Sequence, residues 1–181
     1  MCAPDPVRLF LDFSHQKLFG QYAPRLRTCV DSLSDEQIWW RANQASNSVG
    51  NLLLHLNGNV GQWMVASFNR LPDERNRPAE FHEQEQPAKS IVMERLNATL
   101  ARAEQTLLGL TAEDLLATWT IQGYTVTGLA AVYQVVEHFG LHYGQIAYIT
   151  KMLLNADLGF YRDLSQTGHL PATQSTPRNT P

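Results

Sequence analysis

Two histidines stand four positions apart in the stretch VVEHFGLHYGQIAYITKML (residues 135–153), whose pattern predicts one long helix. Side chains at positions i and i+4 of a helix lie on the same face, so His138 and His142 would point into the same space. Two imidazoles on one rigid element supply half of the ligands of a typical divalent metal site. The pair alone is a weak signal, because a chain with six histidines can place two of them at this spacing by chance.

A third histidine, His55, lies in the stretch SVGNLLLHLNGNVGQW (residues 48–63), which also has a helical pattern. At about 100° per residue, His55 shares its face with uncharged polar side chains such as Asn59, while leucines and valines occupy most other sides. The histidine face of the last helix is similarly apolar, apart from two glutamines that include Gln145. A solvent-facing surface normally carries Lys, Glu or Arg, so both faces favour a semi-buried polar cavity.

We therefore predict a metal site on three histidines, namely His55, His138 and His142. The alternative is that each histidine is a hydrogen-bonded residue of the core or the surface. Competing motifs are incomplete, because HFGLH lacks the glutamate of HExxH and the chain has no paired Glu-x-x-His of the ferritin-like di-iron type. Glu137 lies roughly 100° away from the histidine face. The other histidines are predicted not to be ligands, because they lie in an early helix, a polar loop and the tail: His15, His82 and His169.

Three neutral imidazoles would leave a divalent ion with its full charge and an open position, at which it can polarise water or bind a thiol. Neither Cys2, at the chain end, nor Cys29, on an early helix, is placed to act as a nucleophile. An exogenous thiol or a metal-bound water is therefore the better candidate. Asn59 and Gln145 share faces with the predicted ligands, and each can orient a ligand, contact a substrate or simply link two helices.

Four substantial helices are predicted to position these residues, and they cover residues 6–33, 48–68, 89–109 and 127–155. Pro24 interrupts the first pattern, where we expect a break or a kink. Residues 69–88 are polar and proline-rich and are predicted to be a long connection rather than a core element. In it, Arg75 and Arg77 either receive an anionic substrate group or belong to a solvated surface. Long connections allow a helix to cross the bundle and run parallel to its predecessor, so the predicted fold is an all-α four-helix bundle with long crossover connections.

Hydroxyl residues mark the predicted starts of helices. Ser48 and Thr127 precede the second and the last long helix, and Ser34 and Thr111 each begin a short capped turn. The segment ATWTIQGYTVTG (residues 117–128) has β-branched residues around a central Gln-Gly and is predicted to form a small hairpin or an extended crossover.

The length of 181 residues suits one domain, predicted over residues 1–164, with residues 165–181 as a disordered tail because they lack apolar content. The net charge of −3 gives no electrostatic footprint for nucleic acid. Long uncharged stretches such as residues 49–69 contain too many amides for a transmembrane helix, and they predict helices buried within a bundle or against a partner subunit. The chain has neither a signal-peptide pattern nor a disulfide framework, so we expect it in the reducing cytoplasm.

The blocks SNSVGNLLLHLNGNVGQW and EHFGLHYGQIAYITKML together resemble the DinB-like superfamily, and more narrowly an uncharacterised bacterial branch with GNL-x-x-HL-x-GN and EH-x-x-x-H-x-GQI blocks. The resemblance covers about residues 8–155 and implies a four-helix bundle with long crossovers. It also implies a divalent metal ion, usually zinc or nickel, held by one histidine of the second helix and two of the fourth. These match His55, His138 and His142 without departure.

Characterised members of the superfamily include transferases and isomerases that depend on mycothiol, bacillithiol or glutathione. The resemblance therefore implies a small-molecule substrate, thiol-dependent transferase-type chemistry and a homodimer, while hydrolysis is also within reach of such a metal. In a dimer, Phe139 and Tyr143 would be buried by the partner, unless they face a neighbouring helix. The competing hypothesis is a non-catalytic bundle in which the metal only ties helices together, or a small-molecule binding protein; the lack of an obvious general base favours it.

Overall fold

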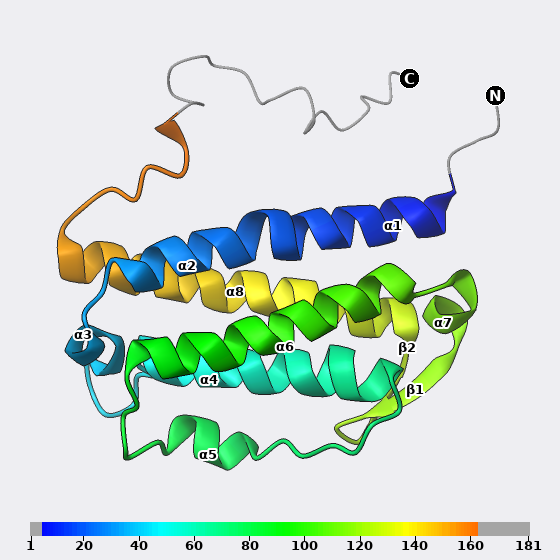
Figure 1. The fold of residues 1–181 in the computed structure, drawn as a ribbon, viewed down its shortest axis with the longest axis horizontal. Helices are drawn as coiled ribbons and strands as arrows, with labels where there is room; N and C mark the ends of the chain where they lie inside the picture. The colour runs from blue at the N-terminus through cyan, green and yellow to red at the C-terminus, as the bar shows by residue number, and fades with distance from the viewer. Residues whose placement is uncertain (1–4, 163–181) are drawn as a thin grey trace.

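The computed structural model of the protein describes residues 5–162, so Cys2, His169 and the predicted tail at residues 165–181 lie outside it. Within this part, long helical stretches lie side by side along the molecule (Figure 1). In chain order they are α1 (Pro6–His15) with the π-helical segment η1 (Gln16–Tyr22) and α2 (Ala23–Asp31); α4 (Val49–Val60) with the π-helical segment η2 (Gly61–Ala66); α6 (Lys89–Gly109); and α8 (Gly128–Leu154). The predicted all-α four-helix bundle is confirmed.

The direction of the helices explains the long connection. In Figure 1, α4 and α6 run in the same direction and α8 runs opposite to them. The chain between η2 and α6, here named the crossover segment (residues 67–88), therefore returns along the whole length of the bundle before α6 begins. This segment carries the short helix α5 (Arg77–Phe81), which packs against α4.

Each predicted hydroxyl cap is present. Ser34 Oγ accepts from the N–H of Gln37 at the start of α3 (Asp35–Trp39), and Thr111 caps α7 (Ala112–Leu116) in the same way. Ser48 caps α4 and Thr127 caps α8, so both helices that carry the site histidines begin at a fixed residue. These side chains satisfy N–H groups that have no partner inside the helix.

The segment before α8 forms a hairpin, one of the two predicted forms. Strands β1 (Thr118–Ile121) and β2 (Tyr124–Thr127) pair antiparallel. The two residues between them, Gln122 and Gly123, have φ of 53° and 81°, and a two-residue type I′ turn requires positive φ at both positions.

Of the two forms predicted at Pro24, a break or a kink, the break is wrong, because Tyr22 and Ala23 keep right-handed helical angles and the chain stays helical from α1 through α2. The seven residues of η1, which ends two positions before Pro24, are π-helical. The wider i→i+5 pattern changes the hydrogen bonding around the proline, which has no N–H to donate. A sequence pattern that assumes i→i+4 bonding cannot anticipate this adjustment.

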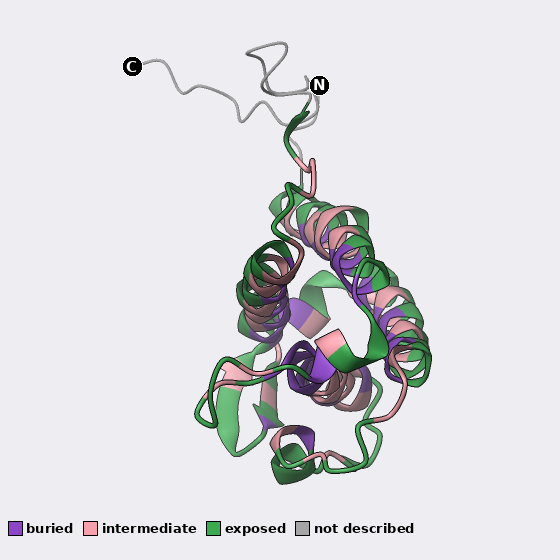
Figure 2. Ribbon diagram, turned by 90° about the vertical axis from the view of Figure 1, so that its left-hand side faces the viewer, coloured by how far each residue is buried: buried purple, intermediate pink, exposed green. Residues whose placement is uncertain are grey.

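Buried residues lie on the sides of the helices that face one another (Figure 2). Trp63 is part of this core, and its Nε1 donates to Gln122 Oε1 at 3.2 Å. Phe139 is fully buried within the core, and Tyr143 stacks on Tyr22 at 5.7 Å between ring centroids. Both aromatic residues therefore contact neighbouring helices of the same chain, which was the alternative to burial by a partner.

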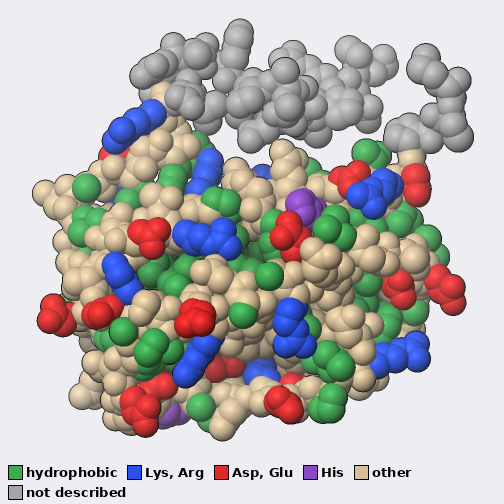
Figure 3. Space-filling model, in the orientation of Figure 1, with side chains coloured by type: hydrophobic (Ala, Val, Ile, Leu, Met, Phe, Trp, Pro, Cys, Tyr) green, Lys and Arg blue, Asp and Glu red, His purple; other side chains and the backbone are tan. Residues whose placement is uncertain are grey.

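The surface in the orientation of Figure 1 carries basic and acidic side chains interspersed (Figure 3). Within residues 5–162, no helix has the length and the apolar character needed to cross a membrane.

Candidate metal centre

The three predicted ligands come together between α4 and α8. His55, His138 and His142 each offer a ring nitrogen, and these nitrogens all lie within 4.8 Å of one another. The Nε2 atoms of His55 and His138 are 2.9 Å apart, and the ring centroids of His138 and His142 are 4.4 Å apart. Within residues 5–162, no other group of three His, Cys, Asp or Glu side chains has this spacing.

The cluster is half-buried. His55 is 5% exposed, whereas His138 and His142 are intermediate, so the cluster opens to solvent on the side of α8. Glu137 is exposed and does not belong to the group. His15 instead pairs with Glu104, and His82 is exposed on the crossover segment.

A buried carboxylate contacts the far side of the His55 ring. Glu80 Oε2 lies 2.8 Å from His55 Nδ1, and Glu80 is 7% exposed. Arg75 binds both oxygens of this carboxylate, with Nε 2.7 Å from Oε1 and Nη2 2.9 Å from Oε2. Burial acts to raise the pKa of Glu80, but the hydrogen bonds from His55 and Arg75 outweigh it, and its pKa lies below the ordinary value. Arg75 Nη2 also lies 3.2 Å from His55 Nδ1, but the closer partner is the Glu80 carboxylate at 2.8 Å. An ionised carboxylate only accepts, so His55 Nδ1 donates its proton to Glu80, and Nε2 is left to face the cluster.

Sequence reasoning missed Glu80, since residues 69–88 were predicted to be a connection without core residues. The segment nevertheless folds α5 onto α4: Asn51 Nδ2 donates to the backbone oxygen of Glu80 at 2.9 Å, and the ring of Phe81 lies 4.9 Å from that of His55. A local signal did exist, because Asn76 caps α5 and Pro78 stands in its first turn, where proline is favoured.

The two amides predicted near the ligands differ in their contacts. Gln145 Oε1 lies 2.7 Å from His142 Nδ1, so it accepts the Nδ1 proton and leaves Nε2 of His142 free to bind. Asn59 is buried, and its Oδ1 has no hydrogen-bond partner within the described chain. Gln145 therefore contacts a predicted ligand, and the role of Asn59 stays a prediction.

Two of the three histidines, His138 and His142, are held in the neutral form that binds metals. Burial lowers the pKa of His138 to about 4, and the neighbouring imidazoles and arginines act in the same direction. Burial also lowers the pKa of His142, although its hydrogen bond to Gln145 opposes the shift.

The distance between the ring nitrogens can be compared with that in a metal site. Two nitrogens bound tetrahedrally to one ion at about 2.0–2.1 Å would be roughly 3.3 Å apart. The distance of 2.9 Å between His55 and His138 is within a few tenths of an ångström of that value, so the donor set fits a divalent ion.

The two arginines of the crossover segment have different environments. The side chain of Arg75 is 4% exposed and bound to Glu80, so it is neither solvated nor available to a substrate. Arg77 is exposed and lies 5.2 Å above the Phe81 ring, at the margin of the cluster.

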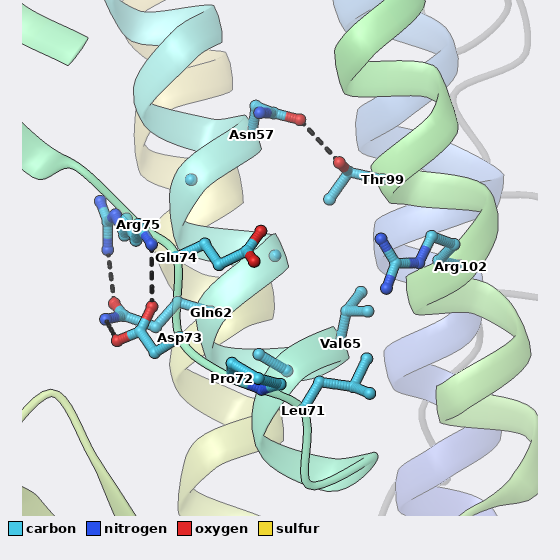
Figure 4. Close-up of a pocket in the computed structure, with 13 residues that line it drawn as sticks. Asn57, Gln62, Val65, Leu71, Pro72, Asp73, Glu74, Arg75, Thr99 and Arg102 are labelled. Carbon is cyan, nitrogen blue, oxygen red and sulfur yellow. Dashed lines mark hydrogen bonds between the residues drawn. The ribbon is translucent and has the colours of Figure 1, made fainter. Parts of the chain in front are cut away.

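Two cavities flank the ligand helices. One, of about 430 Å³, borders the cluster through Gln145 and has no charged side chain in its lining. Its lining consists of Ala45, Ser46, Asn47, Leu52, Gln145, Tyr148 and Ile149. The other, of about 440 Å³, lies between α4 and α6 under the crossover segment (Figure 4). Arg75 and Gln62 form one side of it, and Arg102 projects from α6 on the other.

Comparison with known proteins identifies a matching family and a solved structure with a similar fold. The family described as "protein of unknown function (DUF1572)" matches residues 7–165. A solved DinB-like protein from Bacillus cereus ATCC 10987 is similar to this chain with a TM-score of 0.57 and 13% identity, over 75% of this chain and 87% of that one. No curated protein matches the chain. The predicted DinB-like fold is thus confirmed, whereas identity this low carries no information about activity.

Proposed function

This chain belongs to the DUF1572 family of proteins of unknown function, and within its DinB-like fold we propose a metal-dependent enzyme that binds a divalent ion through His55, His138 and His142. The observation that supports the proposal is the cluster of three imidazoles with their nitrogens within 4.8 Å. Zinc and nickel suit such a nitrogen donor set best.

The incomplete ligand set favours catalysis over a purely structural metal. Structural zinc sites usually have four protein ligands, whereas catalytic sites keep one position open. Within the described chain, three ring nitrogens converge, and the nearest buried carboxylate, Glu80, contacts Nδ1 of His55 on the side away from the cluster. The open side faces α8, where His138 and His142 are half-exposed.

The chemistry that fits best is thiol-dependent transfer to a small molecule. A divalent ion on three imidazoles keeps its charge of +2 and stabilises a bound thiolate or hydroxide. Burial raises the pKa of the Cys29 thiol to about 11, so this cysteine is not a nucleophile at neutral pH. The thiol is therefore a separate low-molecular-weight molecule.

The uncharged cavity beside Gln145 is the proposed binding site for that small molecule. It is adjacent to the cluster because Gln145 both lines it and hydrogen-bonds His142, while Leu52 brings α4 to it one turn before His55.

A non-catalytic role is the second candidate. The cluster joins α4 to α8, and the buried carboxylate beside it among residues 5–162, Glu80, is not free to act as a general base, because His55 binds one of its oxygens and Arg75 binds both. A metal that only stabilises the bundle, or a small-molecule binding protein, would need no such base.

We also infer a homodimer formed through the outer face of α8. Five large apolar side chains on this helix are exposed, namely Leu129, Tyr133, Leu141, Tyr148 and Met152. A stripe of this kind is typical of an interface. Light scattering of the wild type should give twice the chain mass, and replacement of Tyr133 by Glu should give the monomer.

We infer the reducing cytoplasm as the compartment, where the free thiol of buried Cys29 is stable.

Metal analysis of the purified protein tests the site. We expect about one zinc or nickel ion per chain in the wild type and in His82→Ala, and loss of that ion in His55→Ala, His138→Ala and His142→Ala. Equal metal content in all five proteins would refute the site.

A thiol screen then separates the two roles. Turnover of an electrophilic acceptor with a low-molecular-weight thiol, lost in His138→Ala, would support the enzyme. No turnover with any thiol, together with a large loss of melting temperature on chelation, would support the structural role.

A further inference from the structure

We propose that Glu80 is the positioning residue of the metal site, whose carboxylate holds His55 in the one tautomer that presents Nε2 to His138 and His142. This inference rests on the proposed metal site. The carboxylate comes from the crossover segment, so a part of the chain outside the bundle helices would complete the site.

The first step is the direction of the His55 ring. Its Nδ1 is 2.8 Å from Glu80 Oε2, and its Nε2 is 2.9 Å from His138 Nε2. One side of the ring therefore faces the carboxylate, and the other side faces the histidine cluster. A neutral imidazole carries one proton, and the carboxylate accepts it at Nδ1. The lone pair is then at Nε2, where a metal ion would need it. Ligand histidines commonly donate their other nitrogen to a carboxylate, which fixes the ring and raises its basicity.

The second step is what holds the carboxylate. Arg75 donates Nε and Nη2 to the two oxygens of Glu80, and its Nη1 donates to Gln62 Oε1 at 2.8 Å. Gln62 Nε2 in turn donates to Asp73 Oδ2 at 2.6 Å. A planar guanidinium bound to both oxygens leaves the carboxylate little freedom to rotate away from His55.

The third step is the space that the carboxylate occupies. A Cβ atom on Gly58 would lie 2.0 Å from Glu80 Oε1 and 2.9 Å from Arg75 Nε. The carboxylate therefore lies directly against the backbone of α4, three residues after His55, where any side chain would displace it. Asn51 fixes the Glu80 backbone on the same helix through its 2.9 Å hydrogen bond.

The test compares Glu80→Gln with a matched control. Glu104→Gln makes the same chemical change in a second histidine–glutamate pair, in which Glu104 Oε1 lies 2.8 Å from His15 Nε2 outside the cluster. The zinc affinity of each variant is measured by chelator competition on protein with wild-type helical circular dichroism. We expect Glu80→Gln to bind zinc roughly 10- to 100-fold more weakly and Glu104→Gln to match the wild type.

Removal of the carboxylate charge leaves Arg75 buried without its partner, which can prevent folding. The double variant Arg75→Met with Glu80→Leu avoids this, because apolar residues can replace a buried ion pair at little cost. It should fold and show the same loss of zinc affinity.

A His55→Ala background separates positioning from simple packing. If Glu80 acts through His55, then Glu80→Gln causes no further loss of the weak zinc binding that His138 and His142 retain once His55 is absent, measured by titration at high zinc concentration. An equal loss in both backgrounds would overturn the inference and leave Glu80 as an anchor of α5. Wild-type zinc affinity in Glu80→Gln would overturn it as well, without touching the three-histidine site. A wild type that binds no zinc would instead refute the proposed function itself.

Discussion

The Nε2 atoms of His55 and His138 lie 2.9 Å apart, although 83 residues separate them in the chain. In the neutral state, two ring nitrogens this close must share one proton or one cation, because two lone pairs facing each other repel. Without a metal, that proton is the Nε2 proton of neutral His138, which His55 Nε2 accepts. The lowered pKa of His138 disfavours a second, charging proton on the pair, so a divalent ion would take the place of the shared proton without competition from an imidazolium at neutral pH.

Metal binding should stabilise the fold, because the three donors come from two different helices. At a zinc concentration of about 100 times Kd, the free energy of unfolding should rise by roughly 2.7 kcal/mol, which for a chain of this size is about 5–10 °C in melting temperature. Differential scanning calorimetry of wild type and His142→Ala, each with and without zinc, measures this rise. The same increase in both proteins would show that zinc binds elsewhere.

The stability of the metal-free protein should depend on His138 between neutral and acid pH. Its pKa falls from 6.5 in the unfolded chain to about 4 in the fold, so the unfolded chain binds more protons between these values. The corresponding stability is fully present above pH 6.5 and is lost as pH falls towards 4. Urea unfolding at pH 7 and at pH 4.5 should therefore show a smaller loss of stability in His138→Gln than in the wild type. His82→Gln, on the exposed part of the crossover segment, serves as the control and should lose as much as the wild type.

The site histidines could be predicted because their signal is local. The i, i+4 pair needs only a regular helix, and α8 is regular over its whole length. Caps such as Ser48 and Thr127 are equally local, since each needs only the next three residues. The grouping of His55 with the pair was predicted from the uncharged polar faces of the two helices and from the family resemblance, whereas the antiparallel direction of α4 and α8 was not predicted.

The contacts of Glu80 could not be predicted, for a physical reason. The crossover segment has the composition of a solvated loop, and only its path back along α4 buries two of its charged side chains, Glu80 and Arg75. The compensating charge on Arg75 is five residues away, a spacing that no regular helix or strand predicts. The π-helical segments η1 and η2 were not predicted, because the periodicity argument assumed 3.6 residues per turn throughout each helix.

Gln145 should influence metal affinity less than Glu80. Its hydrogen bond to His142 Nδ1 is 2.7 Å long, but Gln145 is exposed, so water can replace the lost oxygen in Gln145→Ala. We expect a loss of zinc affinity below the roughly 10-fold that buried partners of ligands produce. Gln134→Ala is the matched control on the same helix, since Gln134 Oε1 has no hydrogen-bond partner within the described chain. If Gln145→Ala lost as much zinc affinity as Glu80→Gln, the expectation that an exposed partner of a ligand matters less than a buried one would be wrong.

Two glycines of the second long helix should respond in opposite ways to alanine. At Gly61 a new Cβ would meet only Thr99 Cγ2 at 3.7 Å, an ordinary contact, so Gly61→Ala should stabilise the protein by about 0.4–1 kcal/mol by restricting the unfolded chain. At Gly58 the new Cβ would overlap the Glu80 carboxylate, which His55 and Arg75 hold in place.

Gly58→Ala should therefore lower both the free energy of unfolding and the zinc affinity, while Gly61→Ala leaves zinc affinity unchanged. Urea unfolding and chelator competition on the two variants measure both quantities. A stable Gly58→Ala protein with wild-type zinc affinity would mean that the carboxylate can leave α4 without consequence for His55. The close approach of Glu80 to the helix would then be incidental to the metal site.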